Sequence, residues 1–314
     1  MASNVIISSF DPDIVQGDGV VDFNIMFSGK TFRISQMIDT INDINKHRSN
    51  RKLIRYAVIN NSIDRSVREG TTFSRRTGEI NALTIPRDNP LAALEKIREL
   101  DKTGGFRDVI AWDELHYMNL DVLPIILEFQ KEGRAQWFSG LDTDFRKEPY
   151  FLMTAILKLF KYRIKSRATC TFEEANERCS DPAVQNIRMV QNFVAINERE
   201  YPNTVHGSFY KKDNGSLEIV ITDYAYAPYW QRTVLVRGTP GIEYTVACAK
   251  HSCVPRANET KIIFDYIQKQ RVTTIEKIKN EGFSNMPDLE DILKFLVTER
   301  NIKYDNEKKL YSFK

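Results

Sequence analysis

Residues 20–31 read VVDFNIMFSGKT. The apolar start predicts a β-strand over Val20–Ile25, and the amphipathic residues after it predict a helix over Thr31–Asn45. The sequence Gly29-Lys30-Thr31 therefore lies between a strand and a helix. A phosphate-binding loop needs small residues there, so that backbone N–H groups can turn toward phosphate oxygens, together with a Lys and a Ser or Thr hydroxyl. The free N–H groups at the start of the helix add to such an anion site.

The pattern G-x-x-x-x-G-K-S/T is incomplete because Asn24 stands at the first glycine position. Asn adopts left-handed backbone angles more readily than most residues, so the substitution weakens the pattern without cancelling it. On the tripeptide alone, a chance Gly-Lys-Thr at a helix start is the alternative interpretation.

The rest of the first half of the chain alternates between short apolar runs and longer amphipathic ones. Strands are predicted over Leu53–Ile59, Val109–Trp112 and Ala135–Ser139, and helices over Pro90–Lys102, Leu120–Lys131 and Tyr150–Leu159. Strands that alternate with helices in this way predict an α/β fold with a mostly parallel sheet flanked by helices.

Composition excludes several classes of protein. The chain has 314 residues, 42% of them hydrophobic and 28% charged, which is the balance of a globular chain of about two domains. Four cysteines are too few for a disulfide framework. A net charge of +3 does not indicate nucleic-acid binding, and the apolar runs are too short for a membrane helix. No basic stretch precedes an apolar one at the start, so no signal peptide and a cytoplasmic location are expected.

A second element supports phosphoryl transfer. The predicted strand Val109–Trp112 ends in two adjacent carboxylates, Asp113 and Glu114. In a phosphate-loop fold, an acid at the carboxyl end of a strand faces the nucleotide and holds Mg²⁺. The second carboxylate can then take a proton from an attacking hydroxyl. The alternative is an ordinary acidic pair at a helix N-terminus.

Five motifs together resemble one family, the type II thymidine kinases. Residues 26–31 (MFSGKT) resemble the M-F-S/A-G-K-T/S loop of that family, and residues 113–117 (DELHY) resemble its D-E-x-Q-F. Residues 140–150 (GLDTDFRKEPY) are similar to its GLD-x-D/T-F-R-x-x-P-F stretch. Residues 64–65 (DR) with 74–78 (SRRTG) are similar to its D-R … S-S-R-x-G loop, and residues 244–251 (YTVACAKH) to its Y-x-x-V-C-R-K-H.

The resemblance implies an ATP-dependent thymidine or deoxynucleoside kinase that serves nucleotide salvage and DNA precursor synthesis. The implied catalytic residues are Glu114, the proton acceptor for the nucleoside 5′-hydroxyl, with Lys30 and Asp113. Thr31 and Asp113 would hold Mg²⁺. The implied ATP-binding residues are Asn24, Ile25, Met26, Phe27, Ser28, Gly29, Lys30, Thr31, Asp64, Arg65, Asp113 and His116.

The nucleoside would be bound by Phe145, Tyr117 and a lasso loop. The lasso residues and their neighbour are Leu235, Val236, Arg237, Gly238, Thr239 and Tyr244. His116 stands where the family usually has Gln, and Thr239-Pro240-Gly241 replaces a Gly-Gly pair. Thymidine is therefore the first acceptor to test, with deoxyuridine or another deoxynucleoside as alternatives.

The resemblance also implies a structural zinc ion. Cys170, Cys248 and His251 match three of its ligands, and the spacing of Cys248 and His251 suits tetrahedral zinc. Glu173 and Cys179 are alternative fourth ligands. Loss of the zinc, with Cys170 as a buried thiol, is the competing interpretation.

The chain is expected to have four parts. These are a mobile arm (1–18), a phosphate-loop kinase domain (19–169), a lasso and zinc-ribbon-like subdomain (170–254) with an insertion at 179–230, and a winged-helix-like C-terminal unit (255–314). A helix is expected within Asp181–Glu200. The C-terminal unit would contain helices over Thr260–Gln270, Thr273–Asn280 and Leu289–Arg300, then a hairpin within Ile302–Phe313.

The expected partners follow from these parts. The last of the three helices begins with Asp288, Glu290 and Asp291, which repel phosphate, so protein contact or oligomerisation is favoured over DNA binding. Family resemblance implies a homotetramer. The rival to a kinase is a catalytically impaired, kinase-like regulatory protein that binds nucleotide or DNA without turnover.

Overall fold

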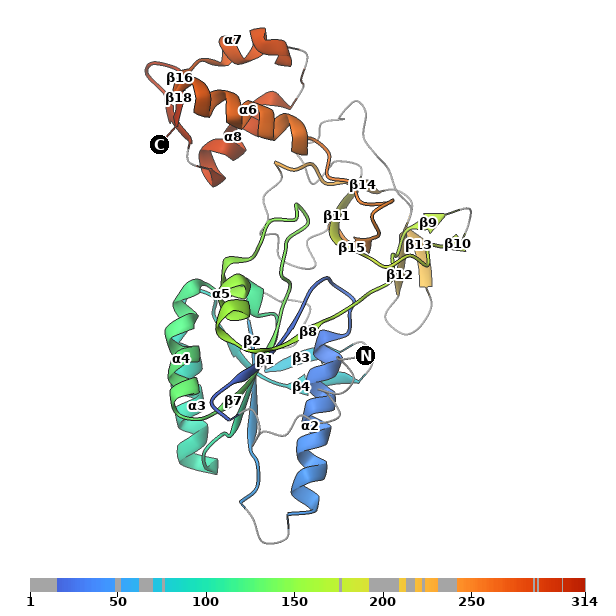
Figure 1. Ribbon diagram of the computed structural model, residues 1–314, viewed down its shortest axis with the longest axis vertical. Helices are drawn as coiled ribbons and strands as arrows, with labels where there is room; N and C mark the ends of the chain where they lie inside the picture. Colours follow the sequence, from blue (N-terminus) through green and yellow to red (C-terminus); the bar gives the residue numbers. More distant parts are fainter. Residues whose placement is uncertain are drawn as a thin grey trace. The chain divides into compact units, whose positions relative to one another are not determined.

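The structure is a computed structural model, and its chain divides into two compact units that are described separately (Figure 1). Unit 1 comprises the described residues up to Thr169 together with Asp181–Asn186, and unit 2 comprises the remainder. The structure describes residues 16–48, 52–61, 70–74, 77–174, 177–191, 209–212, 218–221, 224–230, 242–284, 286, 288–300 and 302–313.

Unit 1 is built on a six-stranded parallel sheet, as the alternation of strands and helices predicts. Its strand order is β5-β2-β6-β7-β1-β8, and every neighbouring pair is parallel. The strands are β1 (Gly19–Phe23), β2 (Tyr56–Asn61), β5 (Leu83–Ile85), β6 (Val109–Trp112), β7 (Ala135–Ser139) and β8 (Tyr162–Lys165). A two-stranded hairpin of β3 (Thr71–Ser74) and β4 (Gly78–Asn81) lies between β2 and β5 in the sequence.

Helices cover both faces of this sheet (Figure 1). On one face, α2 (Lys30–Lys46) buries Ile34, Met37 and Ile41 against the strands. On the other face lie α3 (Leu91–Gly104), α4 (Leu123–Lys131) and α5 (Phe151–Leu159). Because both faces are covered, β6 and β7 are buried along their whole length, including the polar Gln136 and Ser139 of β7.

The helix predicted over Leu120–Lys131 differs at its start. Leu120–Val122 form a 3₁₀ turn, and the α-helix begins at Leu123. Pro124 lies in the first turn of α4, where its missing N–H has no helical partner to lose.

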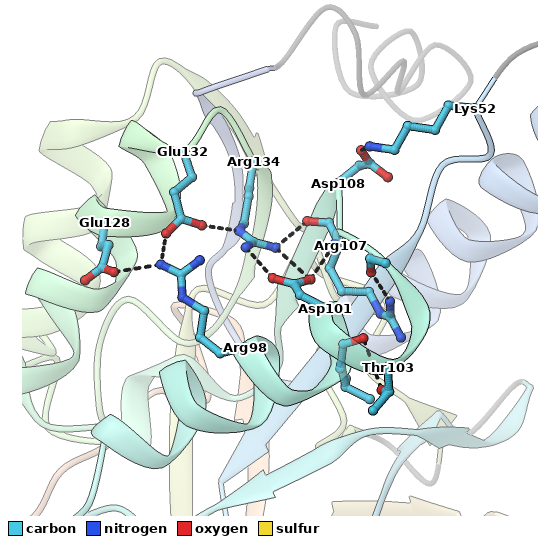
Figure 2. A network of polar contacts seen from close by, with 11 residues as sticks. Lys52, Arg98, Asp101, Thr103, Arg107, Asp108, Glu128, Glu132 and Arg134 are labelled. Carbon is cyan, nitrogen blue, oxygen red and sulfur yellow. Dashed lines mark hydrogen bonds and ion pairs between the residues drawn. The ribbon is translucent and has the colours of Figure 1, made fainter.

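Arg134 anchors the amino ends of the strands (Figure 2). It immediately precedes β7, and its side chain is fully buried. Its Nη2 and Nη1 donate to the Asp101 carboxylate at 2.6 and 3.4 Å, and its Nε donates to Glu132 at 2.6 Å. Nη1 also donates to the carbonyl of Arg107 at 2.7 Å, and the Phe106 ring centre lies 4.0 Å from Cζ. The buried guanidinium therefore has partners for nearly all of its N–H groups.

The same network continues to the surface through α3 and α4. Arg98 contacts Glu132 and donates to Glu128 at 2.9 Å (Figure 2). The Arg98 and Glu128 side chains are 41% and 46% exposed, so solvent screens this outer part of the network.

Unit 2 contains β-hairpins and a three-stranded sheet. The hairpins are β9 (Glu173–Glu174) with β10 (Glu177–Arg178), and β12 (Phe209–Lys212) with β13 (Glu218–Ile221). The sheet has the order β14-β11-β15, formed by Tyr224–Tyr226, Gln185–Gln191 and Ile242–Ala247.

The prediction of a helix within Asp181–Glu200 is wrong over its described part. Residues Gln185–Gln191 form strand β11, which pairs on both sides. Asn186, Ile187 and Arg188 are buried in succession, so the segment lacks the exposed face that an amphipathic helix requires.

The C-terminal part of unit 2 has three helical segments and a small antiparallel sheet. The helices are α6 (Ala257–Gln270), α7 (Ile275–Ile278), which a π-type turn over Lys279–Phe283 continues, and α8 (Leu289–Glu299). The sheet has the order β16-β18-β17, from Val272–Thr273, Leu310–Phe313 and Ile302–Asp305. Trp230 precedes this C-terminal part in the sequence. Its side chain is buried and donates from Nε1 to Asp288 at 3.0 Å.

Across the part of the chain that the structure describes, no helix combines the length and apolar character needed to cross a membrane.

A candidate phosphoryl-transfer site and a cysteine-histidine cluster

The loop between β1 and α2 has the backbone that its sequence predicts. Asn24, Phe27 and Gly29 have φ angles of 110°, 57° and 79°, in the region that favours glycine. Asn24 thus takes a backbone conformation of the kind a glycine would supply, and its Nδ2 donates to the Ser166 carbonyl at 2.5 Å. The substitution at the first glycine position is therefore accommodated within the loop.

Lys30 lies at the first position of α2 and is 7% exposed. Its Nζ donates to the Ile25 carbonyl at 2.7 Å and to the Ser28 hydroxyl at 3.3 Å. Burial lowers the pKa of Lys30, while the carboxylates of Glu114, Asp22 and Asp113 act to raise it. An anion placed beside the ammonium group would favour its charged form further.

Asp113 follows β6 directly and is 1% exposed. Thr31 Oγ1 lies 3.3 and 3.2 Å from its two carboxylate oxygens, and Thr72 Oγ1 donates to Oδ2 at 2.5 Å. Burial raises the pKa of Asp113, and hydrogen bonds from Thr72, Ser139 and Thr31 oppose that rise. The structure thus brings the predicted Mg²⁺ ligands Thr31 and Asp113 together.

Glu114 and His116 lie next along the chain. Glu114 has a φ of 50°, a costly conformation for a residue with a side chain, and such strain concentrates at functional sites. Its Oε2 lies 3.5 Å from His116 Nδ1. Burial, followed by the charge of Lys30, lowers the pKa of His116 well below its usual value. The Leu141 N–H donates to Nδ1 at 3.3 Å, so Nδ1 acts as an acceptor in this contact.

The predicted nucleoside-binding residues are divided between the two units. In unit 1, Tyr117 lies beside His116, with ring centres 4.1 Å apart, and Phe145 is 3% exposed. In unit 2, Tyr244 accepts a hydrogen bond on its hydroxyl from Arg188 Nε at 2.9 Å. The remaining predictions, Asp64, Arg65 and the lasso residues Leu235, Val236, Arg237, Gly238 and Thr239, lie outside the described residues.

Two buried amides that the sequence analysis did not single out link the loops of this site. Asn186 Oδ1 accepts from the Met26 N–H at 2.8 Å, and Asn186 Nδ2 donates to the Thr143 carbonyl at 2.9 Å. Gln185 Nε2 donates to the Phe145 carbonyl at 2.7 Å. Asn186 therefore joins the predicted phosphate loop to the predicted nucleoside loop. The Asn186–Met26 contact spans 160 residues of sequence, so no local pattern could reveal it.

Unit 2 holds a compact cluster of metal-ligating side chains. The ligand atoms of Cys170, Cys179, Cys248 and His251 all lie within 4.8 Å of one another. The three cysteines are buried. Cys179, one of the two alternatives for the fourth position, belongs to this cluster, and Glu173 does not. Hairpin β9–β10 explains this, because it turns the chain back so that the Cys179 N–H donates to the Phe172 carbonyl at 2.8 Å.

The distances within the cluster suit a tetrahedral metal ion. His251 Nδ1 lies 3.5 Å from Cys170 Sγ and 3.4 Å from Cys248 Sγ, and the Sγ atoms of Cys179 and Cys248 are 3.9 Å apart. Tetrahedral zinc bonds of ~2.3 Å to sulfur and ~2.0 Å to nitrogen require separations of about 3.8 Å and about 3.5 Å. Burial raises the pKa of Cys170 to about 12, so the thiol needs a bound cation to ionise at neutral pH.

The chain has the features of a phosphate-loop protein. A Gly-Lys-Thr loop connects a strand to a helix, and an acid follows strand β6. Comparison with known proteins narrows this class. A family model described as thymidine kinase matches residues 20–201, which is more than half of the chain. The chain belongs to the thymidine kinase family.

Individual relatives match shorter stretches. The thymidine kinase of Halobacterium salinarum is 29% identical over 83 residues, 26% of this chain and 40% of the relative. That of Deinococcus deserti is 31% identical over 91 residues, 29% of this chain and 42% of the relative. That of Mycoplasma mobile is 25% identical over 156 residues, 49% of this chain and 70% of the relative. The chain thus spans less than half the length of the first two relatives.

Proposed function

We propose that this protein is a deoxynucleoside kinase that transfers the γ-phosphate of ATP to the 5′-hydroxyl of thymidine. One observation carries the proposal: Lys30, Thr31, Asp113 and Glu114 converge at the carboxyl end of the parallel sheet in a member of the thymidine kinase family. The rival, a kinase-like protein that has lost turnover, is not favoured, because the lysine and both carboxylates are present and lie in one place.

The loop from Asn24 to Thr31 would bind the triphosphate of ATP. Lys30 would neutralise phosphate charge, and its lowered pKa supports this role because a buried ammonium group gains most from a neighbouring anion. Asp64, Arg65 and His116 would complete the donor side. Catalysis would come mainly from positioning and charge neutralisation.

Mg²⁺ would be held by Asp113 and the Thr31 hydroxyl, the oxygen ligands that this ion prefers. The residues present suit a Mg²⁺ site, because the Thr31 and Thr72 hydroxyls both contact the Asp113 carboxylate. When bound, the ion would neutralise part of the negative charge of the transferring phosphoryl group. The Thr72 hydroxyl would continue to orient Asp113 by donating to the same carboxylate.

Glu114 would accept the proton of the 5′-hydroxyl. Its side chain is 23% exposed, which leaves a face for substrate, and its strained backbone supports a functional role. Tyr117, Phe145, Tyr244 and the lasso residues would bind the nucleoside. Thymidine is the first acceptor, and deoxyuridine and other deoxynucleosides are the alternatives.

The test is incubation with ATP, Mg²⁺ and a panel of nucleosides, with chromatographic detection of monophosphates. We expect thymidine monophosphate from the wild type and a loss of roughly 10²–10⁴-fold in kcat for Glu114→Gln, since a carboxamide cannot accept the proton. No phosphorylation of any nucleoside, or full activity in Glu114→Gln, would refute the proposal.

The second part of the proposal is that Cys170, Cys179, Cys248 and His251 hold a structural zinc ion. The agreement of the interatomic distances with tetrahedral zinc supports it. Cys179→Ser should lower bound zinc, measured by elemental analysis, well below one equivalent. Cys253→Ser is the matched control, because Cys253 packs against the cluster without belonging to it. Glu173→Gln should likewise retain the metal. Equal zinc content in Cys179→Ser and the wild type would contradict the assignment.

The assembly and location of the protein are further parts of this proposal. The family resemblance supports a homotetramer, and a cytoplasmic location suits a kinase that feeds DNA precursor synthesis. In the C-terminal unit, the acidic residues Glu290 and Asp291 in the first turn of α8 support protein contact over DNA binding.

A further inference from the structure

A buried ion pair lies beneath the phosphate loop. Asp22, the fourth residue of β1, has an exposed fraction of 0%. Arg33, in the first turn of α2, donates to it through Nε at 2.6 Å and Nη2 at 2.9 Å. The Ser166 hydroxyl contacts both side chains. A buried carboxylate in a strand is costly unless it is paired and hydrogen-bonded, and this one has both.

The guanidinium also reaches into the loop. Arg33 Nη1 donates to the Ser28 carbonyl at 2.9 Å. Ser28 is itself tied to the loop, because its hydroxyl donates to the Ile25 carbonyl at 2.8 Å. A loop carbonyl that is engaged by Arg33 is not directed at a bound phosphate, and backbone N–H groups are what an anion site must present. Arg33 therefore connects the strand, the helix and the loop in a single fork.

The pair also acts on the charge of the site. The charge of Asp22 raises the pKa of Lys30, and the charge of Arg33 lowers it, so the effects of both groups reach the lysine that faces the predicted phosphate. Together the two charges cancel. Without Arg33, a buried negative charge would remain beneath a site that must receive a triphosphate. Without Asp22, the remaining charge would be positive and would attract the same ligand.

We propose that binding of a nucleoside triphosphate to the phosphate loop depends on Arg33, which holds the Ser28 carbonyl and compensates the buried charge of Asp22. The proposal rests on the proposed function only in requiring that the loop bind a triphosphate. It predicts an asymmetry that a purely structural ion pair would not produce. Loss of the cation should weaken triphosphate binding, and loss of the anion should not.

The experiment measures the Kd of Mg-ATP by calorimetry for the wild type, Arg33→Gln, Asp22→Asn and the double variant. Circular dichroism first identifies a temperature at which all four are folded. We expect Arg33→Gln to raise Kd roughly tenfold, and Asp22→Asn to stay within about threefold of the wild type or to bind more tightly. The double variant should recover most of the loss, because its site is again neutral beneath the loop.

Two further variants make the test specific. Arg33→Lys keeps the charge but not the planar fork, so it should bind ATP better than Arg33→Gln. Lys46→Gln is the matched control, because Lys46 forms an exposed ion pair with Asp43 on the same helix and should leave Kd unchanged. Equal losses in Arg33→Gln and Asp22→Asn, or no recovery in the double variant, would overturn the inference. ATP binding without any phosphorylated product would refute the kinase function alone, and no ATP binding by the wild type would overturn both.

Discussion

The two ends of the parallel sheet in unit 1 both carry buried charges, but they use them differently. At the amino ends of the strands, carboxylates and a carbonyl surround the Arg134 guanidinium (Figure 2). The Phe106 ring lies against the same group. At the carboxyl ends, burial shifts the pKa of Lys30 downward and that of Asp113 upward, so both shifts disfavour the charged form. The first end pairs its charges within the protein, whereas at the second end the hydrogen bonds of Lys30 and Asp113 do not fully offset the cost of burying their charges.

This difference separates residues that stabilise the fold from residues that are held for a reaction. The Arg134 network lies at the end of the sheet away from the phosphate loop, so it should contribute nothing to binding, and removal of Arg134 would leave costly unpaired charge. Buried charged groups with incomplete compensation cost stability, and such groups cluster at functional sites. Substitutions at the two ends of the sheet should therefore have opposite effects on activity and on stability.

Lys30→Met should abolish activity without weakening the fold. We expect kcat/KM to fall by roughly 10³-fold or more, because the charge that neutralises the transferring phosphoryl group is lost. The free energy of unfolding should stay the same or rise, because an apolar side chain replaces a buried ammonium group. Steady-state kinetics and urea unfolding measure the two quantities, with Lys46→Met as the surface control. A decrease of several kcal/mol in the free energy of unfolding of Lys30→Met would contradict this division.

Arg134→Met should give the opposite result. Asp101 would lose the guanidinium that pairs with it and Glu132 would keep only its contact with Arg98, so the expected loss of stability is about 3–5 kcal/mol. At a temperature where the variant is folded, kcat and KM should match the wild type, because the network lies at the amino ends of the strands. Arg98→Met, at the exposed end of the network, should cost less than about 1 kcal/mol. Lost activity in fully folded Arg134→Met would contradict the assignment.

Asn186→Leu should reduce kcat/KM roughly tenfold, because the bridge between the Met26 N–H and the Thr143 carbonyl is lost. Gln185→Met is the comparison variant within the same strand, because Gln185 donates to the Phe145 carbonyl. The loss in Asn186→Leu should exceed that in Gln185→Met at equal folded fraction. Equal losses would mean that the bridge has no special part in aligning the two loops.

The smallest expected effect is on the pH dependence of stability. Burial acts to raise the pKa of Asp101, but hydrogen bonds from Arg134 and the Arg107 N–H outweigh it, so this pKa lies below its usual value of 3.8. A lowered pKa contributes stability above pH 3.8, and that contribution is lost as the pH falls further. For Asp113 the sign is reversed, because its raised pKa favours the folded state in acid and costs stability as the pH rises through it.

Urea unfolding between pH 3 and pH 7 separates the two carboxyl groups. Asp101→Asn should remove part of the decrease in stability that the wild type shows in acid. Asp113→Asn should raise stability near neutral pH. Identical pH profiles for both variants would show that the two ends of the sheet do not differ in this respect.

Local sequence patterns predict the elements that the chain specifies over short distances. The loop from Asn24 to Thr31, the acids after β6 and the parallel sheet were expected, because each depends on residues that are adjacent or regularly spaced. The three segments of the C-terminal part were expected for the same reason. Their assignment as a winged helix stays a prediction.

Contacts between distant residues are what the sequence could not reveal. Thr72 reaches Asp113 across 41 residues and Asn24 reaches Ser166 across 142, and no spacing rule connects them. The sequence of β11 predicts a helix because no local pattern reveals its pairing with β14 and β15. The choice between Glu173 and Cys179 depended on the turn of one hairpin.

The central claim is that the carboxyl end of the sheet transfers a phosphoryl group from ATP to a nucleoside. The most direct measurement is quantitation of both products after incubation of the wild type with ATP, Mg²⁺ and thymidine. We predict thymidine 5′-monophosphate and ADP in equal amounts, and neither product from Lys30→Met. ADP formed without the monophosphate, or no turnover with thymidine or any other deoxynucleoside, would contradict the account.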